Sequence, residues 1–210
     1  MNTYIVPCSA AQGFSRVFIV DPGGHADTIA ENTEDCEVAG IILTHGHFDH
    51  CGAVKALKKR YNGVPLCIHA GDRAYTGKTA YGTHREDFLR MGALYLMEEL
   101  GDSFSDFPEA NIVFDRDDVL SFAPEWSLIH TSGHSPGSIC LYHKSGHLLS
   151  GDTLFASGVG RTDLRGGSFD QLQKSLERLF ELPDDTKVYP GHGGFTSIGR
   201  EKLFREKCGF

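Results

Sequence analysis

The stretch Thr44-His45-Gly46-His47-Phe48-Asp49-His50 is the most informative segment of this sequence. It follows an apolar run, residues 40–43, that is typical of a buried strand, and it precedes a segment with helical spacing of apolar residues. Alternate residues at a strand end direct the first two histidines toward one point, whereas the Asp-His pair enters the helix and faces a second point nearby. Imidazole and carboxylate groups are common metal ligands. The stretch therefore predicts a site for two metal ions.

Three glycine-flanked loops later in the chain carry further candidate ligands. They contain Gly133-His134, Gly151-Asp152-Thr153 and Pro190-Gly191-His192, and each follows a run with β character. Loops of this kind gather functional groups on a rigid scaffold. Histidines can instead cap helices or satisfy hydrogen bonds in the core, but the clustered spacing favours metal ligation. We therefore add His134, Asp152 and His192 to the predicted site.

The composition describes one globular domain over residues 1–210, since 40% of the residues are hydrophobic and no linker or repeat interrupts the chain. The net charge of −8 disfavours nucleic acid as a partner. No apolar run reaches the roughly 20 residues that a membrane helix needs, and the first residues do not resemble a signal peptide. The six scattered cysteines favour reduced, separate thiols. We expect a cytoplasmic protein without a membrane partner.

The alternation of strand and helix patterns predicts an α/β protein. Residues 2–6 and 16–20 predict a β-hairpin that ends at Asp21-Pro22-Gly23-Gly24, and a helix is expected from about 49 to 60. The segment from about 72 to 111, with one helix near 86–100, is interpreted as a surface excursion. The other expected strands are 64–69, 127–130, 138–142, 147–150 and 187–189, and the strongest amphipathic helix is 169–182.

The order Thr-His-x-His-x-Asp-His, Gly-His, Gly-Asp-Thr, Pro-Gly-His resembles that of the metallo-β-lactamase-fold hydrolases over nearly all of the chain. The resemblance implies an αββα four-layer sandwich, in which two mixed β-sheets are flanked by helices and metals lie at one edge. It implies two divalent metal ions, with zinc expected and iron or manganese as alternatives. By this resemblance His45, His47 and His134 would hold one ion, Asp49, His50 and His192 the other, Asp152 would bridge them, and Asp21 would orient a ligand imidazole.

Within this family, residues 151–155, 160–167 and 196–202 resemble the short bacterial type of glyoxalase II. The resemblance implies a thioester hydrolase acting on S-lactoylglutathione or a related hydroxyacyl-glutathione by attack of a metal-bridged hydroxide, with Asp49 and Asp152 as catalytic residues. Arg161 lies where larger relatives carry a basic substrate-binding residue, and a structural salt bridge is the alternative role. Few residues follow His192, so no C-terminal helical domain is expected and the glutathione contacts that it supplies in larger relatives are missing.

Other functions remain open at this stage. An iron-dependent persulfide dioxygenase of the same fold would retain most of these motif residues. A phosphodiesterase or ribonuclease is disfavoured by the acidic net charge. A true β-lactamase is disfavoured because such enzymes usually lack the second imidazole of the Asp49-His50 pair, and a purely structural metal is disfavoured because structural zinc sites are usually mononuclear and closed. The sequence leaves the oligomeric state open.

Overall fold

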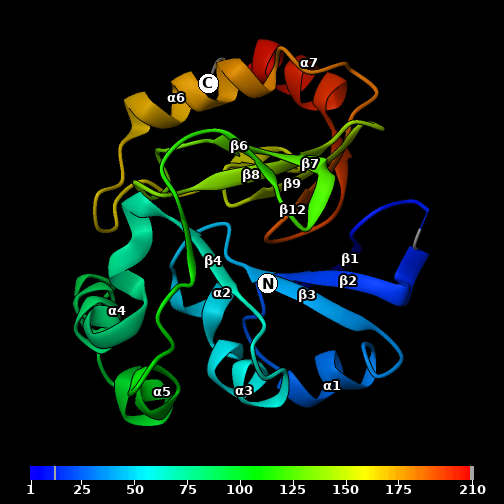
Figure 1. The fold of residues 1–210 in the computed structure, drawn as a ribbon. Helices are drawn as coiled ribbons and strands as arrows, with labels where there is room; N and C mark the ends of the chain where they lie inside the picture. Colours follow the sequence, from blue (N-terminus) through cyan, green and yellow to red (C-terminus); the bar gives the residue numbers. More distant parts are fainter. Residues whose placement is uncertain (12, 209–210) are drawn as a thin grey trace.

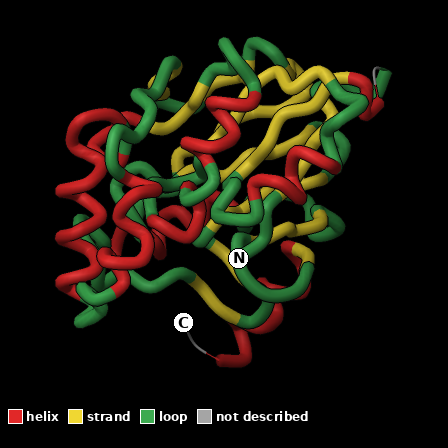
Figure 2. The backbone as a smooth tube through the Cα atoms, turned by 90° about the horizontal axis from the view of Figure 1, so that it is seen from below, coloured by secondary structure: helices red, strands yellow, loops and turns green. Residues whose placement is uncertain are grey.

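Two β-sheets pack face to face, with helices on both outer surfaces, in the computed structural model, which describes residues 1–11 and 13–208 (Figure 1). The first sheet lies above α1, α2 and α3, and the second lies beneath α6 and α7. Figure 2 shows the same layers from below, with helices lying across the strands. The predicted αββα arrangement of two mixed sheets is confirmed.

The first sheet has five strands in the order β1-β2-β3-β4-β5. Its β1 and β2 pair antiparallel as the predicted hairpin, and the remaining neighbours are parallel. Because parallel strands are covered on both faces, their central residues are mostly apolar, and all four residues of β4 are buried. The strands are β1 (Tyr4–Pro7), β2 (Arg16–Val20), β3 (Glu37–Ile42), β4 (Leu66–His69) and β5 (Ile112–Phe114), and the helices beneath them are α1 (Ala26–Glu31), α2 (Phe48–Cys51) and α3 (Val54–Arg60).

The second sheet has six strands in the order β13-β12-β9-β8-β7-β6. Only β9 and β12 pair in parallel among its neighbours, so this sheet is mixed as well. Its strands are β6 (Asp118–Leu120), β7 (Ala123–His130), β8 (Ile139–His143), β9 (His147–Gly151), β12 (Lys187–Pro190) and β13 (Thr196–Ser197), and a separate ribbon joins β10 (Leu154–Phe155) to β11 (Gly158–Val159).

The helices α6 (Phe169–Leu179) and α7 (Ile198–Cys208) cover the outer face of the second sheet (Figure 1). The Ser168 hydroxyl caps α6 by accepting a hydrogen bond from the backbone N–H of Gln171. Leu172, Leu176 and Leu179 lie at helical spacing and are buried in the cluster between α6 and this sheet. The predicted amphipathic helix is therefore confirmed, and it ends three residues earlier than expected.

The helix expected over 49–60 is interrupted in the structure. The backbone N–H of Ala53 donates to the carbonyl of Pro22, at 2.9 Å, instead of continuing α2. Gly52 also lies against the turn after β2, because a β-carbon there would stand 2.5 Å from the carbonyl oxygen of Gly23. The turn that follows Asp21 thus divides the predicted helix into α2 and α3.

The segment 72–111 is not confined to the surface, contrary to the expectation for it. It forms α4 (Ala80–Arg90) and α5 (Leu96–Phe104) in place of one helix, because Gly92 adopts φ +69° between them. Phe88 and Phe104 are buried in the cluster beneath the first sheet. Two 3₁₀ segments, Ala70–Tyr75 and Gly77–Thr79, connect β4 to α4.

All six cysteines are free thiols, and four of them are buried. Within the part of the chain that the structure describes, none of the helices is both long and apolar enough to cross a membrane.

Replacement of His84 by leucine should weaken the dependence of stability on pH. His84 is buried with its ring 4.0 Å from that of Phe104, and burial lowers its pKa from 6.5 to about 3. The unfolded chain therefore binds the proton first as the pH falls, and stability is lost from pH 6.5 down toward pH 3. Denaturant unfolding at pH 7 and pH 5 should show a loss in free energy of unfolding that is about 2 kcal/mol smaller in His84→Leu than in the native chain. Equal losses in free energy of unfolding in the two proteins would show that His84 is not a source of the pH dependence.

Candidate metal centre

The predicted ligands meet at one edge of the sandwich, where strands of both sheets end. His45 and His47 lie in the turn between β3 and α2, and His134 lies in the loop between β7 and β8. Asp152 follows β9 and His192 follows β12, which are parallel neighbours and so end at the same edge. Residues far apart in the sequence are thereby brought within contact distance.

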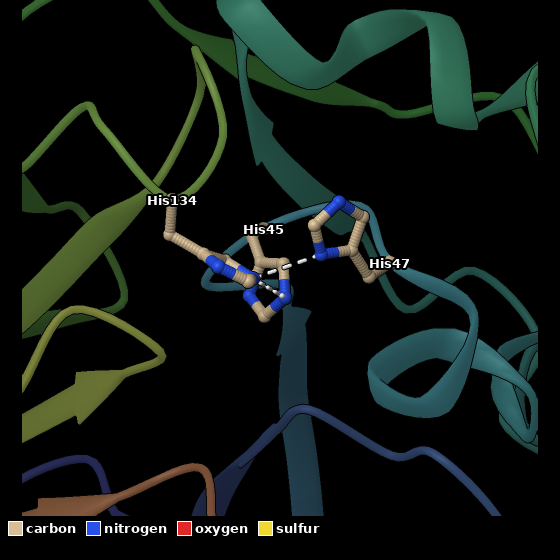
Figure 3. Close-up of side chains that lie close together, drawn as sticks. All are labelled: His45, His47 and His134. Carbon is tan, nitrogen blue, oxygen red and sulfur yellow. Dashed lines mark hydrogen bonds between the residues drawn. The ribbon is translucent and has the colours of Figure 1, made fainter. Parts of the chain in front are cut away.

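Three imidazoles form the first group (Figure 3). Nδ1 of His47 lies 2.8 Å from Nε2 of His134, which lies 3.2 Å from Nε2 of His45. All three side chains are buried. Three ring nitrogens therefore face one point, as a metal ion with imidazole ligands requires.

Hydrogen bonds to the ring nitrogens that point away from the group fix the tautomers of two of these histidines, His134 and His45. Nδ1 of His134 donates to the backbone carbonyl of Arg161 at 2.7 Å, which leaves a lone pair on its Nε2. The Thr44 hydroxyl donates to Asp21, so it accepts from Nδ1 of His45 at 3.1 Å, and Nε2 of His45 is likewise unprotonated. Two lone pairs facing each other at this distance repel, and a shared cation removes the repulsion.

Asp21 lies directly behind both groups of ligands. It adopts φ +51° at the end of β2, an uncommon conformation that aspartate tolerates. Its carboxylate accepts hydrogen bonds from the N–H and the hydroxyl of Thr44, and from Nδ1 of His50 at 2.9 Å. Asp21 therefore lies behind His50, one of the predicted ligands, and its role in orienting a metal ligand stays a prediction.

The second group consists of Asp49, His50 and His192. Nε2 of His192 lies 3.0 Å from the Asp49 carboxylate and 3.3 Å from Nε2 of His50. The His192 side chain is 41% exposed whereas His50 is fully buried, so this group forms the solvent side of the centre.

The loop that carries His192 is held by the first residues of the chain. The Asn2 side-chain amide donates to the carbonyls of Pro190 and Gly193, both at 3.0 Å, and the Tyr4 hydroxyl donates to Pro190 at 2.7 Å. Asn2 and the first residue of β1 thus hold the loop that carries His192, the most exposed residue of the second group.

Asp152 lies between the two groups. Its Oδ1 is 3.3 Å from Nε2 of His50, and its Oδ2 is 3.5 Å from Nε2 of His192 and 3.7 Å from Nε2 of His134. Asp152 Oδ1 and His47 Nε2 are buried without a hydrogen-bond partner among the described residues. An orphaned carboxylate oxygen beside converging imidazoles fits a cation shared by both groups, as the sequence predicts for Asp152.

The electrostatics of the centre also favour bound cations. Burial lowers the pKa of His45 and His47, and the neighbouring imidazoles lower it further, so these rings are neutral, as ligands must be. Burial opposes ionisation of Asp49, but the hydrogen bond from His192 and the charge of His50 bring its pKa below the ordinary value. The three-imidazole group thus presents neutral rings, and Asp49 of the second group is ionised.

Two glycines allow the ligand loops to approach closely. A β-carbon at Gly191 would lie 2.2 Å from Oδ1 of Asp152 and 2.6 Å from Cε1 of His50. A β-carbon at Gly160 would lie 1.9 Å from the backbone oxygen of Asp152 and 2.9 Å from Nδ1 of His134. Part of the glycine content of the sequence is therefore required by the metal centre.

Arg161 contributes to the centre through its backbone. Its guanidinium is half-exposed and forms a bidentate pair with Asp163, with both distances 2.7 Å. The structure therefore contains the salt bridge that was the alternative role for this residue, and the predicted substrate contact stays a prediction. The backbone carbonyl of Arg161 orients His134, a role that side-chain patterns in the sequence cannot indicate.

A family model described as the metallo-beta-lactamase superfamily matches residues 4–192, a span that contains every residue of both groups. The chain belongs to this superfamily. Its curated relatives include the hydroxyacylglutathione hydrolase GloC of Haemophilus influenzae, which is 31% identical over 96% of this chain and 95% of GloC.

Several solved structures have the same fold as this chain. TTHA1623 in a di-iron-bound form has a TM-score of 0.75 at 30% identity, covering 96% of this chain and 91% of that one. The B3 metallo-β-lactamase BLEG-1 has a TM-score of 0.72 at 29% identity, covering 96% and 97%. ETHE1 from Myxococcus xanthus has a TM-score of 0.67 at 25% identity, covering 95% and 76%. One chain of this fold is thus a di-iron form and another is a B3 metallo-β-lactamase, so the fold by itself does not identify the substrate.

Replacement of Gly191 by alanine should weaken metal binding, because the new methyl group must displace Asp152 or His50. We expect at least about tenfold weaker binding, the loss typical when the surroundings of a metal ligand are disturbed. Competition with a chromophoric chelator measures this affinity. Gly194→Ala is the matched control, since a β-carbon there meets no atom within 4 Å. Equal metal affinity of the two variants would show that the close approach is unimportant.

Proposed function

We propose that this protein is a binuclear-metal hydrolase of thioesters, with S-lactoylglutathione or a related hydroxyacyl-glutathione as substrate. The observation that carries the proposal is the position of Asp152 between a group of three imidazoles and a second group that contains Asp49. The 31% identity to GloC supports the substrate class. We place the reaction in the cytoplasm, where free thiols such as glutathione persist.

Bound divalent metals lower the pKa of coordinated water to about 7 and so supply a nucleophile at neutral pH. The chain's residues prepare this chemistry. His45, His47 and His134 would hold one ion, Asp49, His50 and His192 the other, and Asp152 would contact both. The leaving thiol, with a pKa of about 8.5, departs as a thiolate and needs no acid from the protein.

The decisive experiment combines metal analysis with turnover. Protein purified without added metal should contain two metal ions per chain and should hydrolyse S-lactoylglutathione equally fast with and without oxygen. One iron per chain, with oxygen uptake on glutathione persulfide, would establish instead the persulfide dioxygenase alternative, and hydrolysis of a β-lactam, RNA or a phosphodiester in place of the thioester would also overturn the proposal. Metal analysis reports zinc, iron or manganese directly.

Replacement of Asp152 by alanine should reduce kcat for thioester hydrolysis by at least about a thousandfold, because the two groups of ligands lose the carboxylate between them. Circular dichroism confirms that the variant is folded, and metal analysis should find fewer than two ions. A folded Asp152→Ala protein with full activity would contradict the assigned role.

Replacement of Arg161 by alanine tests the proposed contact with a glutathione carboxylate. Loss of a partly exposed charged contact should raise KM about tenfold with little change in kcat. Arg165→Ala is the matched control, because Arg165 is also partly exposed and pairs with a carboxylate, that of Glu86. If both variants change KM equally, Arg161 has no specific contact with the substrate.

A further inference from the structure

Asp72 is a fully buried carboxylate whose hydrogen bonds go to Gly46, Ser135 and Gly137 and not to the side chains of the predicted metal ligands. It lies in the 3₁₀ segment Ala70–Tyr75 that follows β4, where the sequence predicted the start of a surface excursion. A buried carboxylate is costly unless hydrogen bonds satisfy it. The partners of Asp72 therefore indicate what it does in this protein.

Both oxygens of Asp72 are bonded to the loops that carry the three imidazoles. Oδ2 accepts from the backbone N–H of Gly46 at 2.9 Å and from the Ser135 hydroxyl at 2.6 Å. Oδ1 accepts from the backbone N–H of Gly137 at 2.8 Å. Gly46 lies between His45 and His47, and Ser135 follows His134. One carboxylate thus joins the ligand turn of the first sheet to the ligand loop of the second.

The loop of the second sheet is also ordered internally around this contact. The Ser135 hydroxyl donates to Asp72, so it accepts from the Ser138 hydroxyl at 2.8 Å. The Ser138 oxygen in turn accepts from the backbone N–H of Ser135 at 3.0 Å. Each donor in this series of three hydrogen bonds has an acceptor, so the series specifies the position of the His134 loop relative to Asp72.

Glycines permit the backbone of the Asp72 segment to lie against both loops. A β-carbon at Gly137 would stand 2.4 Å from the backbone nitrogen of Asp72, and one at Gly71 would stand 2.6 Å from the carbonyl of Pro136. A β-carbon at Gly46 would overlap the ring of Tyr75, which also contacts the His47 ring in an edge-on geometry. The three segments are therefore in direct van der Waals contact around the carboxylate.

We propose that Asp72 is a positioning residue for the metal centre, which sets the separation of the His45-His47 turn from the His134 loop and so tunes the affinity of the three-imidazole group for its ion. Asp72 accepts no hydrogen bond from the second group, Asp49, His50 and His192. Asp72 should therefore affect the two metal ions unequally. This inference concerns metal binding alone and holds whatever the substrate is.

Replacement of Asp72 by asparagine tests the proposal. Three donors face the carboxylate, and the amide nitrogen of asparagine cannot accept a hydrogen bond, so at least one loop contact is lost. In a titration of the metal-free protein with Zn²⁺ against a chromophoric chelator, one of the two equivalents should bind about 10- to 100-fold more weakly, and the other should be nearly unchanged. The absorption bands of the Co²⁺-loaded protein should change for the same equivalent only.

Two further variants make the result unambiguous. Glu201→Gln is the matched control, because Glu201 is another buried carboxylate, bonded to the Ser157 N–H and the Thr196 hydroxyl, away from both ligand loops. It should lose stability while both equivalents keep their affinity. Ser135→Ala removes one donor to Asp72 and places no new donor against the two that remain. It should give a smaller loss at the same equivalent, which covers the case in which Asp72→Asn does not fold.

Native affinity for both equivalents in Asp72→Asn, or in Ser135→Ala if the former does not fold, would overturn the proposal. An equal loss in Glu201→Gln would overturn it too, because the effect would then be one of general stability. A failure of thioester hydrolysis in the native protein leaves this inference intact, since the measurement is metal affinity.

Discussion

The constraint on which this structure depends is the approach of two unprotonated imidazole nitrogens, Nε2 of His45 and Nε2 of His134, to 3.2 Å. Such an arrangement is unfavourable for the isolated chain, because lone pairs face each other in a buried region. The surroundings stabilise it by engaging the opposite nitrogens of His134 and His45 in hydrogen bonds to a backbone carbonyl and a threonine hydroxyl. The fold thus holds these imidazoles in a geometry suited to a metal ion before any ion binds.

Buried carboxylates serve as connectors between distant segments in this fold. Asp21 joins β2 to the turn after β3 and to His50, Asp72 joins the two loops that bear the first group, and Glu201 joins α7 to the loop after β10. Each is nearly or fully buried, and each accepts two or more hydrogen bonds. A network in which every member is satisfied specifies one arrangement of loops, whereas apolar packing alone tolerates several.

The grouping of most of the predicted ligands could be anticipated from sequence because they lie at strand ends and beside glycines. The hairpin of β1 and β2 and the helix α6 were predictable for a similar reason, since local periodicity and a Ser168 cap determine them. The division of α2 from α3 was not, because it depends on a hydrogen bond from Ala53 to Pro22. Asp72 and the carbonyl of Arg161 were also missed, since their roles arise from contacts with loops that are remote in sequence.

The hydrogen bonds from Asn2 to the loop that carries His192 have a consequence for biosynthesis. A nascent chain emerges with the His45-His47 turn first and acquires His192 nearly 150 residues later, so the complete set of ligands exists only after both ends of the fold have met. An incomplete chain can offer the first imidazoles to a metal ion but cannot enclose it. A metal ion that needs ligands from both groups could therefore be enclosed only once the sandwich has closed, and not when the His45-His47 motif is translated.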